Sequence, residues 1–262
     1  MSALWPARLH HLRRDSPDPE RLARFYGELL GDRVEQIGDK AGSQWLVSGP
    51  QRRLLIGEGK AGAVPYFAFQ VKPGKGEPFK DPLFRDGAVA VSDPDGRQIV
   101  FGLPKEEPSS AGLPGLLQHF VCATTRLPEM VEFYRGLGMV ESDRVLDGDL
   151  LAACFLRSDP EHHSFAAFRA PESRPDHHCY ETTGWMDIRD WADRMGSLHI
   201  KLWWGPGRHG PGNNLFFMVE DPDGYKVEFS AELEHLEREV PFRTWPHEER
   251  TLNLWGNAWM RS

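Results

Sequence analysis

Several features that would place the chain in a specialised class are missing from its sequence. No apolar run approaches the roughly 20 residues of a membrane-spanning helix, and no basic cluster favours nucleic acid. The formal net charge of −8 also argues against a nucleic-acid partner. Three cysteines are an odd number and too few for a disulfide framework. With no visible secretory signal, we expect a cytoplasmic protein without a membrane or nucleic-acid partner.

The chain contains an internal repeat. Residues 9–31 and 117–138 share a His followed fourteen positions later by Phe-Tyr-x-x-Leu. Residues 89–101 and 217–229 share the turn sequence Asp-Pro-Asp-Gly. Residues 105–115, KEEPSSAGLPG, separate the copies and are rich in Pro, Ser and Gly. The sequence therefore predicts two related halves joined by a linker.

These boundaries divide the chain into four parts. We predict an N-terminal domain at residues 1–104, the linker at 105–115, a C-terminal domain at 116–236 and a tail at 237–262. The tail has irregularly spaced aromatic residues, so two roles remain open for it. It either closes over a site as a lid or covers a hydrophobic face or subunit contact.

Apolar spacing in each half predicts a helix after a first strand. Residues 127–134 place four apolar side chains at i, i+3, i+4 and i+7, on one helix face. A further helix is predicted at 187–196, whereas the corresponding residues 72–84 are too rich in Gly and Pro for a regular helix. Strands with Asp-Pro-Asp-Gly hairpins complete each half. We expect an α+β protein with curved mixed sheets.

The repeated strand-helix-strand pattern resembles the vicinal-oxygen-chelate superfamily, which is built of paired βαβββ modules. The segments that carry this likeness are QHFVCATTRLPEMVEFYRGLGM, GPGRHGPGNNLFF and DPDGYKVEF. The chain most resembles the two-domain type I extradiol ring-cleaving dioxygenases. The resemblance implies a non-haem Fe(II) enzyme of aromatic catabolism that cleaves a catechol-type ring with O2. It implies a small aromatic diol and O2 as partners, and we expect a homo-oligomer.

Carried over position by position, the resemblance implies that His119, His178 and Glu228 are the metal ligands. Two neutral imidazoles and one carboxylate on one face of a six-coordinate ion leave positions open for substrate and O2. This facial triad is typical of non-haem Fe(II) oxygenases. Mn(II) accepts the same ligands.

The N-terminal half provides an internal comparison for this ligand set. It retains a His at the first position, His11. We align Tyr66 with His178 and Val100 with Glu228, so two of the three ligands are absent. We therefore predict that the N-terminal half is a degenerate domain without metal.

Two further histidines have catalytic roles if the resemblance holds. His163, in EHHSFAAF, would face bound O2 and relay a proton. His209, in a Gly- and Pro-rich loop, would hydrogen-bond the substrate or the ligand set. We interpret the neighbouring His162 as an exposed loop residue.

Trp204, Asn214 and Met218 are the predicted substrate-binding residues. Many relatives carry a Tyr ten residues before the ligand Glu, where this chain has Met218, and this departure puts ordinary catechol cleavage in question. Trp203 and Trp204 stand where some relatives that bind acidic catechols have basic residues. They favour a larger or more apolar substrate, although a packing role remains open.

Two other functions remain open on the sequence alone. A lyase, isomerase or thiol transferase of the same superfamily would keep the fold and the metal. Such enzymes commonly need a Glu or another base where this chain has His119 or His178. A metal-free small-molecule binding protein would have a degenerate triad, and the triad in this sequence is intact.

Overall fold

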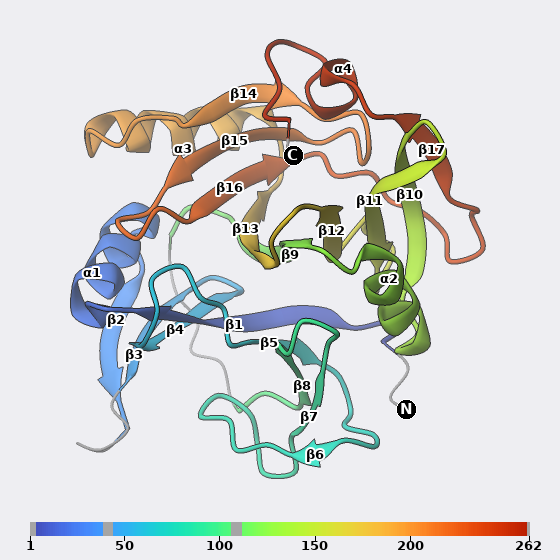
Figure 1. Cartoon of the computed structure of the whole chain (residues 1–262). Coiled ribbons are helices and arrows are strands. Elements are labelled where there is room, and N and C mark those ends of the chain that lie inside the picture. Colours follow the sequence, from blue (N-terminus) through green and yellow to red (C-terminus); the bar gives the residue numbers. More distant parts are fainter. Residues whose placement is uncertain (1–3, 39–43, 106–111, 261–262) are drawn as a thin grey trace.

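Two mixed β-sheets make up the computed structural model, one from each half of the chain (Figure 1). The structure describes residues 4–38, 44–105 and 112–260, so residues 106–111 of the predicted linker lie outside the described residues. In Figure 1 the N-terminal sheet occupies the lower part of the molecule and the C-terminal sheet the upper part.

The N-terminal half forms an eight-stranded sheet in the order β2-β3-β4-β1-β5-β8-β7-β6. Its strands are β1 (Arg8–Ser16), β2 (Arg33–Ile37), β3 (Gln44–Gly49), β4 (Arg52–Glu58), β5 (Tyr66–Gln70), β6 (Glu77–Pro78), β7 (Val89–Ser92) and β8 (Gln98–Gly102). β1 is parallel to β4 and antiparallel to β5, and β5 is parallel to β8. Helix α1 (Pro19–Leu30) follows β1 and packs on β3 and β4.

The C-terminal half forms a nine-stranded sheet in the order β14-β15-β16-β13-β9-β12-β11-β10-β17. Its strands are β9 (Leu116–Thr124), β10 (Val140–Asp147), β11 (Leu150–Arg157), β12 (Phe165–Arg169), β13 (Arg174–Thr182), β14 (Trp204–Arg208), β15 (Leu215–Glu220), β16 (Lys226–Ala231) and β17 (Arg243–Pro246). Its helices are α2 (Leu127–Gly136), α3 (Trp185–Ser197) and α4 (Glu249–Leu252). Here β9 is parallel to β12 and β13 to β16, as in the first half.

The two sheets confirm the predicted α+β class and the paired modules. Three of the four modules have the order strand, helix, three strands. The module that begins at β5 has no helix among its described residues, as its Gly- and Pro-rich sequence predicts. Within the described chain, no helix is long and apolar enough to cross a membrane.

Local sequence explains where α1 begins and ends. Asp18 is the N-cap, and its side chain accepts a hydrogen bond from the backbone N–H of Arg21. Pro19 follows at the first helical position, where no N–H is needed. Gly31 ends the helix with φ of 69°, a left-handed conformation that favours glycine.

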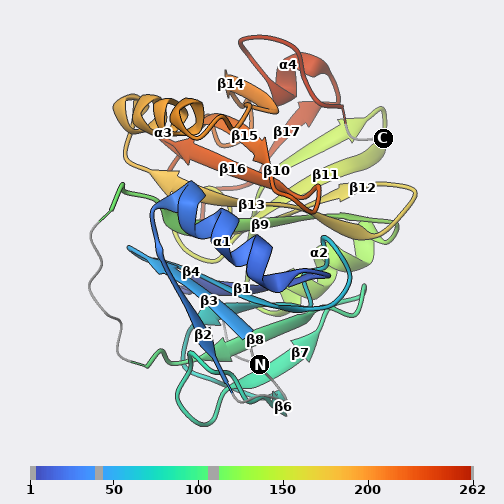
Figure 2. The same cartoon turned by 90° about the vertical axis from the view of Figure 1, so that its left-hand side faces the viewer.

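The largest cluster of buried apolar side chains lies where the two halves meet and takes residues from both. The ring of Phe67, on β5, lies 4.7 Å from the ring of Phe120, on β9. Figure 2 shows α1 at the boundary between the halves. There the side chain of Arg194, on α3, donates to the carbonyl of Leu29 at 2.8 Å.

Reciprocal polar contacts also join the halves. The hydroxyl of Tyr26, on α1, donates to Asp221 in the C-terminal Asp-Pro-Asp-Gly turn at 3.0 Å. The hydroxyl of Tyr134, on α2, donates to Asp93 in the N-terminal turn at 3.5 Å. The buried Arg14 donates to Asp221 as well, at 3.0 Å. Each repeated Tyr thus contacts the turn of the other half, a role that the turn sequence alone did not indicate.

The buried ion pair predicts a stability effect at Asp221. Asp221→Ala leaves the guanidinium of Arg14 buried without its carboxylate, so we expect a loss of about 3–5 kcal/mol in the free energy of unfolding. Arg24→Ala removes an ion pair with Glu20 in which both side chains are exposed, and should cost about 0–1 kcal/mol. Urea unfolding of both variants measures the difference, and equal losses would contradict this role of Asp221.

Candidate metal centre

Three neighbouring strands at the middle of the C-terminal sheet carry the candidate ligands. β16, β13 and β9 are consecutive in the sheet. Glu228 on β16 and His119 on β9 are both paired with Cys179, on the β13 strand between them. His177 lies two residues before Cys179, so strand alternation places it on the same face of the sheet.

Glu228 is the centre of a cluster of imidazoles. Its Oε2 lies 3.1 Å from Nε2 of His177 and 3.8 Å from Nε2 of His119. Its Oε1 lies 3.7 Å from Nε2 of His209. The carboxylate, His119 and His177 are all buried. The structure therefore brings together two of the three predicted ligands, with His177 in the third place.

His178 does not join this cluster, so its prediction as a ligand is wrong. Successive side chains of a strand point to opposite faces, and His178 points away from Glu228. Its ring lies 5.9 Å from that of Tyr26 and 5.5 Å from that of Tyr225. In the described structure neither of its ring nitrogens has a hydrogen-bond partner. His178 is a packing residue between the two halves.

The strand registers also correct the alignment of the N-terminal half. They match Tyr66 with His177, and Phe67 with His178. The hydroxyl of Tyr66 donates to Asp81 at 3.0 Å. A buried Phe at the position of His178 agrees with a packing role for that residue.

The same face of the N-terminal half is filled by its own side chains. His11 Nε2 lies 2.9 Å from the carboxylate of Asp81. Val100 stands at the register position of Glu228 and belongs to a cluster of buried apolar residues with Tyr66 and Phe84. The predicted absence of the full ligand set from this half therefore agrees with the structure.

Each candidate nitrogen ligand has a protein partner on its far side. His177 Nδ1 donates to Asp176 Oδ1 at 2.5 Å. His119 Nδ1 donates to the amide oxygen of Gln118. Metal-bound histidines almost always use the second ring nitrogen in this way, which fixes the tautomer and aims Nε2 at the metal.

The protonation states of Glu228 and His119 also suit a metal. Burial alone would raise the pKa of Glu228, but hydrogen bonds with His119, His177 and His209 hold it well below its usual value. Burial lowers the pKa of His119 to about 4. Burial also opposes the charged form of His177, but hydrogen bonds to Asp176 and Glu228 raise its pKa. An ionised carboxylate and a neutral imidazole are the forms that bind metal ions.

The spacing fits one divalent ion. Neighbouring ligands of an octahedral ion with bonds of about 2.1 Å lie roughly 3 Å apart, close to the 3.1 and 3.8 Å that separate Glu228 from the two imidazoles. Cys179 Sγ also lies within 4.8 Å of the ligand atoms of His119 and Glu228. Burial raises the pKa of that thiol well above its usual value, whereas metals bind thiolate. We therefore prefer His177 to Cys179.

A small cavity opens beside the cluster, with a volume of about 30 Å³. Its histidines and carboxylate are His119, His163, His177, His209 and Glu228, and its other lining residues are Val121, Phe155, Phe168, Pro211, Thr251 and Leu252. The ring of His163 lies 4.3 Å from that of His119. The structure thus places both predicted catalytic histidines, His163 and His209, at the cavity.

The tail covers one side of this cavity through Thr251 and Leu252, on α4. His209 Nδ1 donates to the carbonyl of Leu252 at 2.6 Å, and the backbone of Gly210 donates to that of Thr251 at 3.0 Å. The ring of Phe216 stacks on His209 at 3.8 Å. These contacts support the lid alternative for the tail.

None of the three predicted substrate residues is among the residues that line the cavity. The centre of the Trp204 ring lies 5.6 Å from the centre of the His209 ring. Asn214 donates to Glu228 at 3.4 Å and to Ser230 at 2.8 Å, so it orients the carboxylate. Met218 is buried directly across from Glu228 in the strand register. Strand pairing puts Trp204 and Met218 on the Glu228 face of the sheet, outside the lining of this small cavity, so the role of all three residues as substrate contacts stays a prediction.

Sequence reasoning also missed the apolar wall itself. Val121 follows His119 by two residues on β9, so alternation could have assigned it to the cavity face. Phe155 and Phe168 come from β11 and β12, whose register with β9 no local pattern indicated. The contribution of Leu252 depends on how the tail folds back.

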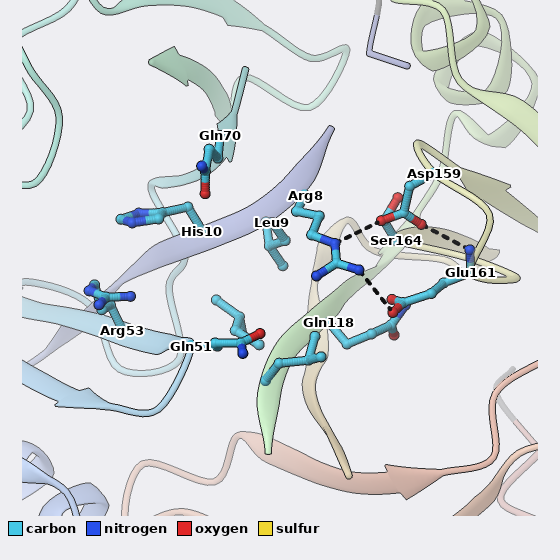
Figure 3. Close-up of a pocket in the computed structure, with 12 residues that line it drawn as sticks. Arg8, Leu9, His10, Gln51, Arg53, Gln70, Gln118, Asp159, Glu161 and Ser164 are labelled. Carbon is cyan, nitrogen blue, oxygen red and sulfur yellow. Dashed lines mark hydrogen bonds and ion pairs between the residues drawn. The ribbon is translucent and has the colours of Figure 1, made fainter. Parts of the chain in front are cut away.

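A second cavity, of about 290 Å³, lies between the first strands of the two halves (Figure 3). In Figure 3 Arg8, on β1, faces Asp159 and Glu161 of the C-terminal half. Gln118 lines this cavity and donates to Glu161 at 3.1 Å. The same Gln118 holds His119, so the polar contacts between the halves extend to a candidate ligand.

The comparisons with known proteins agree with this fold. Residues 116–229 match the model of the Glyoxalase/Bleomycin resistance protein/Dioxygenase superfamily. The predicted resemblance is therefore confirmed, and this segment of the chain is similar to that superfamily. A curated relative, Metapyrocatechase 2 of Cupriavidus necator, is 28% identical over 208 residues. That alignment covers 68% of this chain and 63% of the relative, so the chain spans less than two thirds of its length.

Solved structures show the same architecture. Homoprotocatechuate 2,3-dioxygenase from Arthrobacter globiformis is 22% identical, with a TM-score of 0.85 over 99% of this chain and 91% of that chain. The Brevibacterium fuscum enzyme, in complex with 3,4-dihydroxyphenylacetate, is 22% identical with a TM-score of 0.82, over 95% of this chain and 88% of that chain. At this identity the likeness establishes the fold.

Two neighbouring histidines give a direct test of the ligand set. His177→Ala removes an imidazole beside Glu228, so we expect bound divalent metal to fall from about one ion per chain to a small fraction. His178→Phe installs the residue found at the matching N-terminal position and should leave metal content unchanged. Metal analysis after anaerobic loading measures both. Metal loss in the His178 variant alone would restore the original assignment.

Proposed function

We propose that this protein is a non-haem Fe(II)-dependent extradiol dioxygenase that cleaves a catechol-type ring with O2. The observation that carries the proposal is the buried Glu228, approached by Nε2 of His119 and His177 beside a cavity whose outer wall is apolar. Two imidazoles and one carboxylate suit Fe(II) and leave coordination positions open, and Mn(II) accepts the same set. The similarity to a curated metapyrocatechase supports the same chemistry.

Bound iron would hold the two vicinal oxygens of the substrate and O2 side by side and pass electrons between them. The chain's own contribution is to hold the ligands, exclude water and move protons. His209 Nδ1 donates to the carbonyl of Leu252, so a neutral His209 presents Nε2, 3.7 Å from Glu228 Oε1, as a hydrogen-bond acceptor beside the metal centre. His163 also lines the cavity and would exchange a proton with the substrate.

His163 can act as a general base only if its imidazole is neutral before it accepts a proton. Burial, with His119 and His162 nearby, lowers the pKa of His163 well below its usual value. The imidazole is therefore uncharged at neutral pH and available as a base. Once the proton is on His163, the same ring is the donor that returns it when the ring opens, so no other acid is needed.

The cavity walls define the substrate class within this proposal. Among the described residues, no lysine or arginine lines the cavity, and its outer wall is formed by Val121, Phe155, Phe168 and Leu252. A carboxylate substituent would be buried there without a cation, which is costly. We therefore propose catechols with hydrogen or alkyl substituents as substrates, in preference to carboxylated ones.

The function is tested by anaerobic reconstitution with Fe(II), followed by O2 uptake and absorbance of the ring-fission product. We expect turnover of catechol and methylcatechols, with kcat/KM at least about tenfold above that for 3,4-dihydroxyphenylacetate, since one unpaired buried charge costs more than 1.4 kcal/mol. Glu228→Ala is the inactive control. No activity on any catechol at full iron occupancy would favour a lyase, isomerase or thiol transferase of the same fold.

Substrate size gives a second prediction. The cavity of about 30 Å³ has room for only a few water molecules, so a catechol ring must displace the tail residues Thr251 and Leu252. Leu252→Ala removes part of this wall and should raise kcat/KM for bulky alkylcatechols relative to catechol, by roughly 10-fold for two or three methylenes accommodated. The matched control is Leu254→Ala, outside the cavity lining. Equal changes for small and bulky substrates would argue against a gating wall.

A further inference from the structure

His162 is buried, which corrects its interpretation as an exposed loop residue. Its side chain is fully buried, and its Nε2 lies 2.9 Å from Asp143 Oδ2, on β10. Its Nδ1 lies 3.0 Å from Nδ1 of His163. Three buried side chains therefore form a chain of hydrogen bonds that ends at the cavity.

Asp143 has a second strong partner from the tail. Arg243, on β17, donates through Nε to Oδ1 at 2.8 Å and through Nη2 to Oδ2 at 3.0 Å. Burial alone would raise the pKa of Asp143, but the hydrogen bonds from His162 and Arg243 outweigh it and lower that pKa. The carboxylate is ionised, so it only accepts hydrogen bonds, and His162 Nε2 must carry the proton that it donates.

At most one proton can lie between Nδ1 of His162 and Nδ1 of His163. Arg243 donates to both oxygens of Asp143 and also to Glu234, and a neutral His162 with its proton on Nε2 supplies the remaining donor that Asp143 accepts. A neutral His162 with its proton on Nε2 has a bare Nδ1, which accepts. His163 must then donate from its own Nδ1, and its Nε2 keeps a free lone pair.

We propose that Asp143 and His162 are positioning residues that hold His163 in the tautomer with Nδ1 protonated and Nε2 bare. This role rests on the proposed function for its catalytic meaning, because a bare Nε2 at the cavity is the form that accepts a proton from a substrate hydroxyl. The opposite tautomer would present N–H there and could not act as a base. Arg243 connects this arrangement to the tail strand.

Asp143→Asn is the informative substitution. Its amide oxygen keeps the hydrogen bond from Arg243 Nε, so its amide nitrogen takes the place of Oδ2, loses the hydrogen bond from Arg243 Nη2 and donates to His162 Nε2. His162 Nε2 must then accept, its Nδ1 must carry the proton, and His163 Nδ1 must accept. Both tautomers therefore reverse, as happens when the aspartate of a catalytic triad is replaced by asparagine.

The tautomers can be read without metal or turnover. Long-range 1H–15N spectra of the metal-free, 15N-histidine-labelled protein distinguish protonated from bare ring nitrogens. We expect His163 with protonated Nδ1 in the native protein and protonated Nε2 in Asp143→Asn. In the iron-loaded enzyme kcat should fall roughly 10²–10³-fold, with KM for the catechol nearly unchanged. Asp147→Asn, on the exposed end of β10, is the matched control and should change neither.

The outcomes separate this proposal from the function. A protonated Nε2 on His163 in the native protein, or unchanged tautomers in Asp143→Asn, would overturn it. If the tautomers are as expected but the protein is inactive on all catechols, the positioning role stands and the proposed function is wrong.

If Asp143→Asn fails to fold, His162→Phe retains a buried ring and removes the acceptor. It should then give His163 as a mixture of tautomers, and a single unchanged tautomer would count against the proposal.

Discussion

The buried carboxylate of Glu228 is the constraint on which the rest of the C-terminal half depends. A lone carboxylate without water is costly to bury, and here imidazole nitrogens surround it. Each of those rings is held from behind, by Gln118, Asp176 or the carbonyl of Leu252. Burying this one carboxylate therefore requires supporting contacts from β9, from β13 and from the tail.

The N-terminal half shows what the same fold does without that charge. Val100 replaces the carboxylate, and apolar side chains fill the face that the cavity occupies in the other half. Asp81 enters from a different part of the chain and accepts hydrogen bonds that His11 and Tyr66 can give. The two sheets therefore share a topology whose stability does not require the ligand set, which is why the metal site can be present in one half alone.

The sequence predicted the fold well because the repeat, the helix spacing and the turn sequences are local signals. His119 and Glu228 were also predictable, since each lies in a motif. The choice between His177 and His178 failed because adjacent strand residues face opposite sides, and only the register with β9 fixes which side is inward. The place of Leu252 depends on how the tail folds back, and the buried state of His162 depends on contacts with Asp143 and Glu234, far along the chain, that no sequence pattern encodes.

The crossed contacts of Tyr26 with Asp221 and of Tyr134 with Asp93 have the form of an isologous interface, in which each partner offers the other the same patch. Homodimers have self-complementary interfaces of this kind, and the arrangement of this chain resembles two protomers joined end to end. The N-terminal half lacks two of the three candidate ligands yet has the turn aspartate, Asp93, that contacts its neighbour. Selection on the N-terminal half would therefore act chiefly through the contacts that it makes with the C-terminal half.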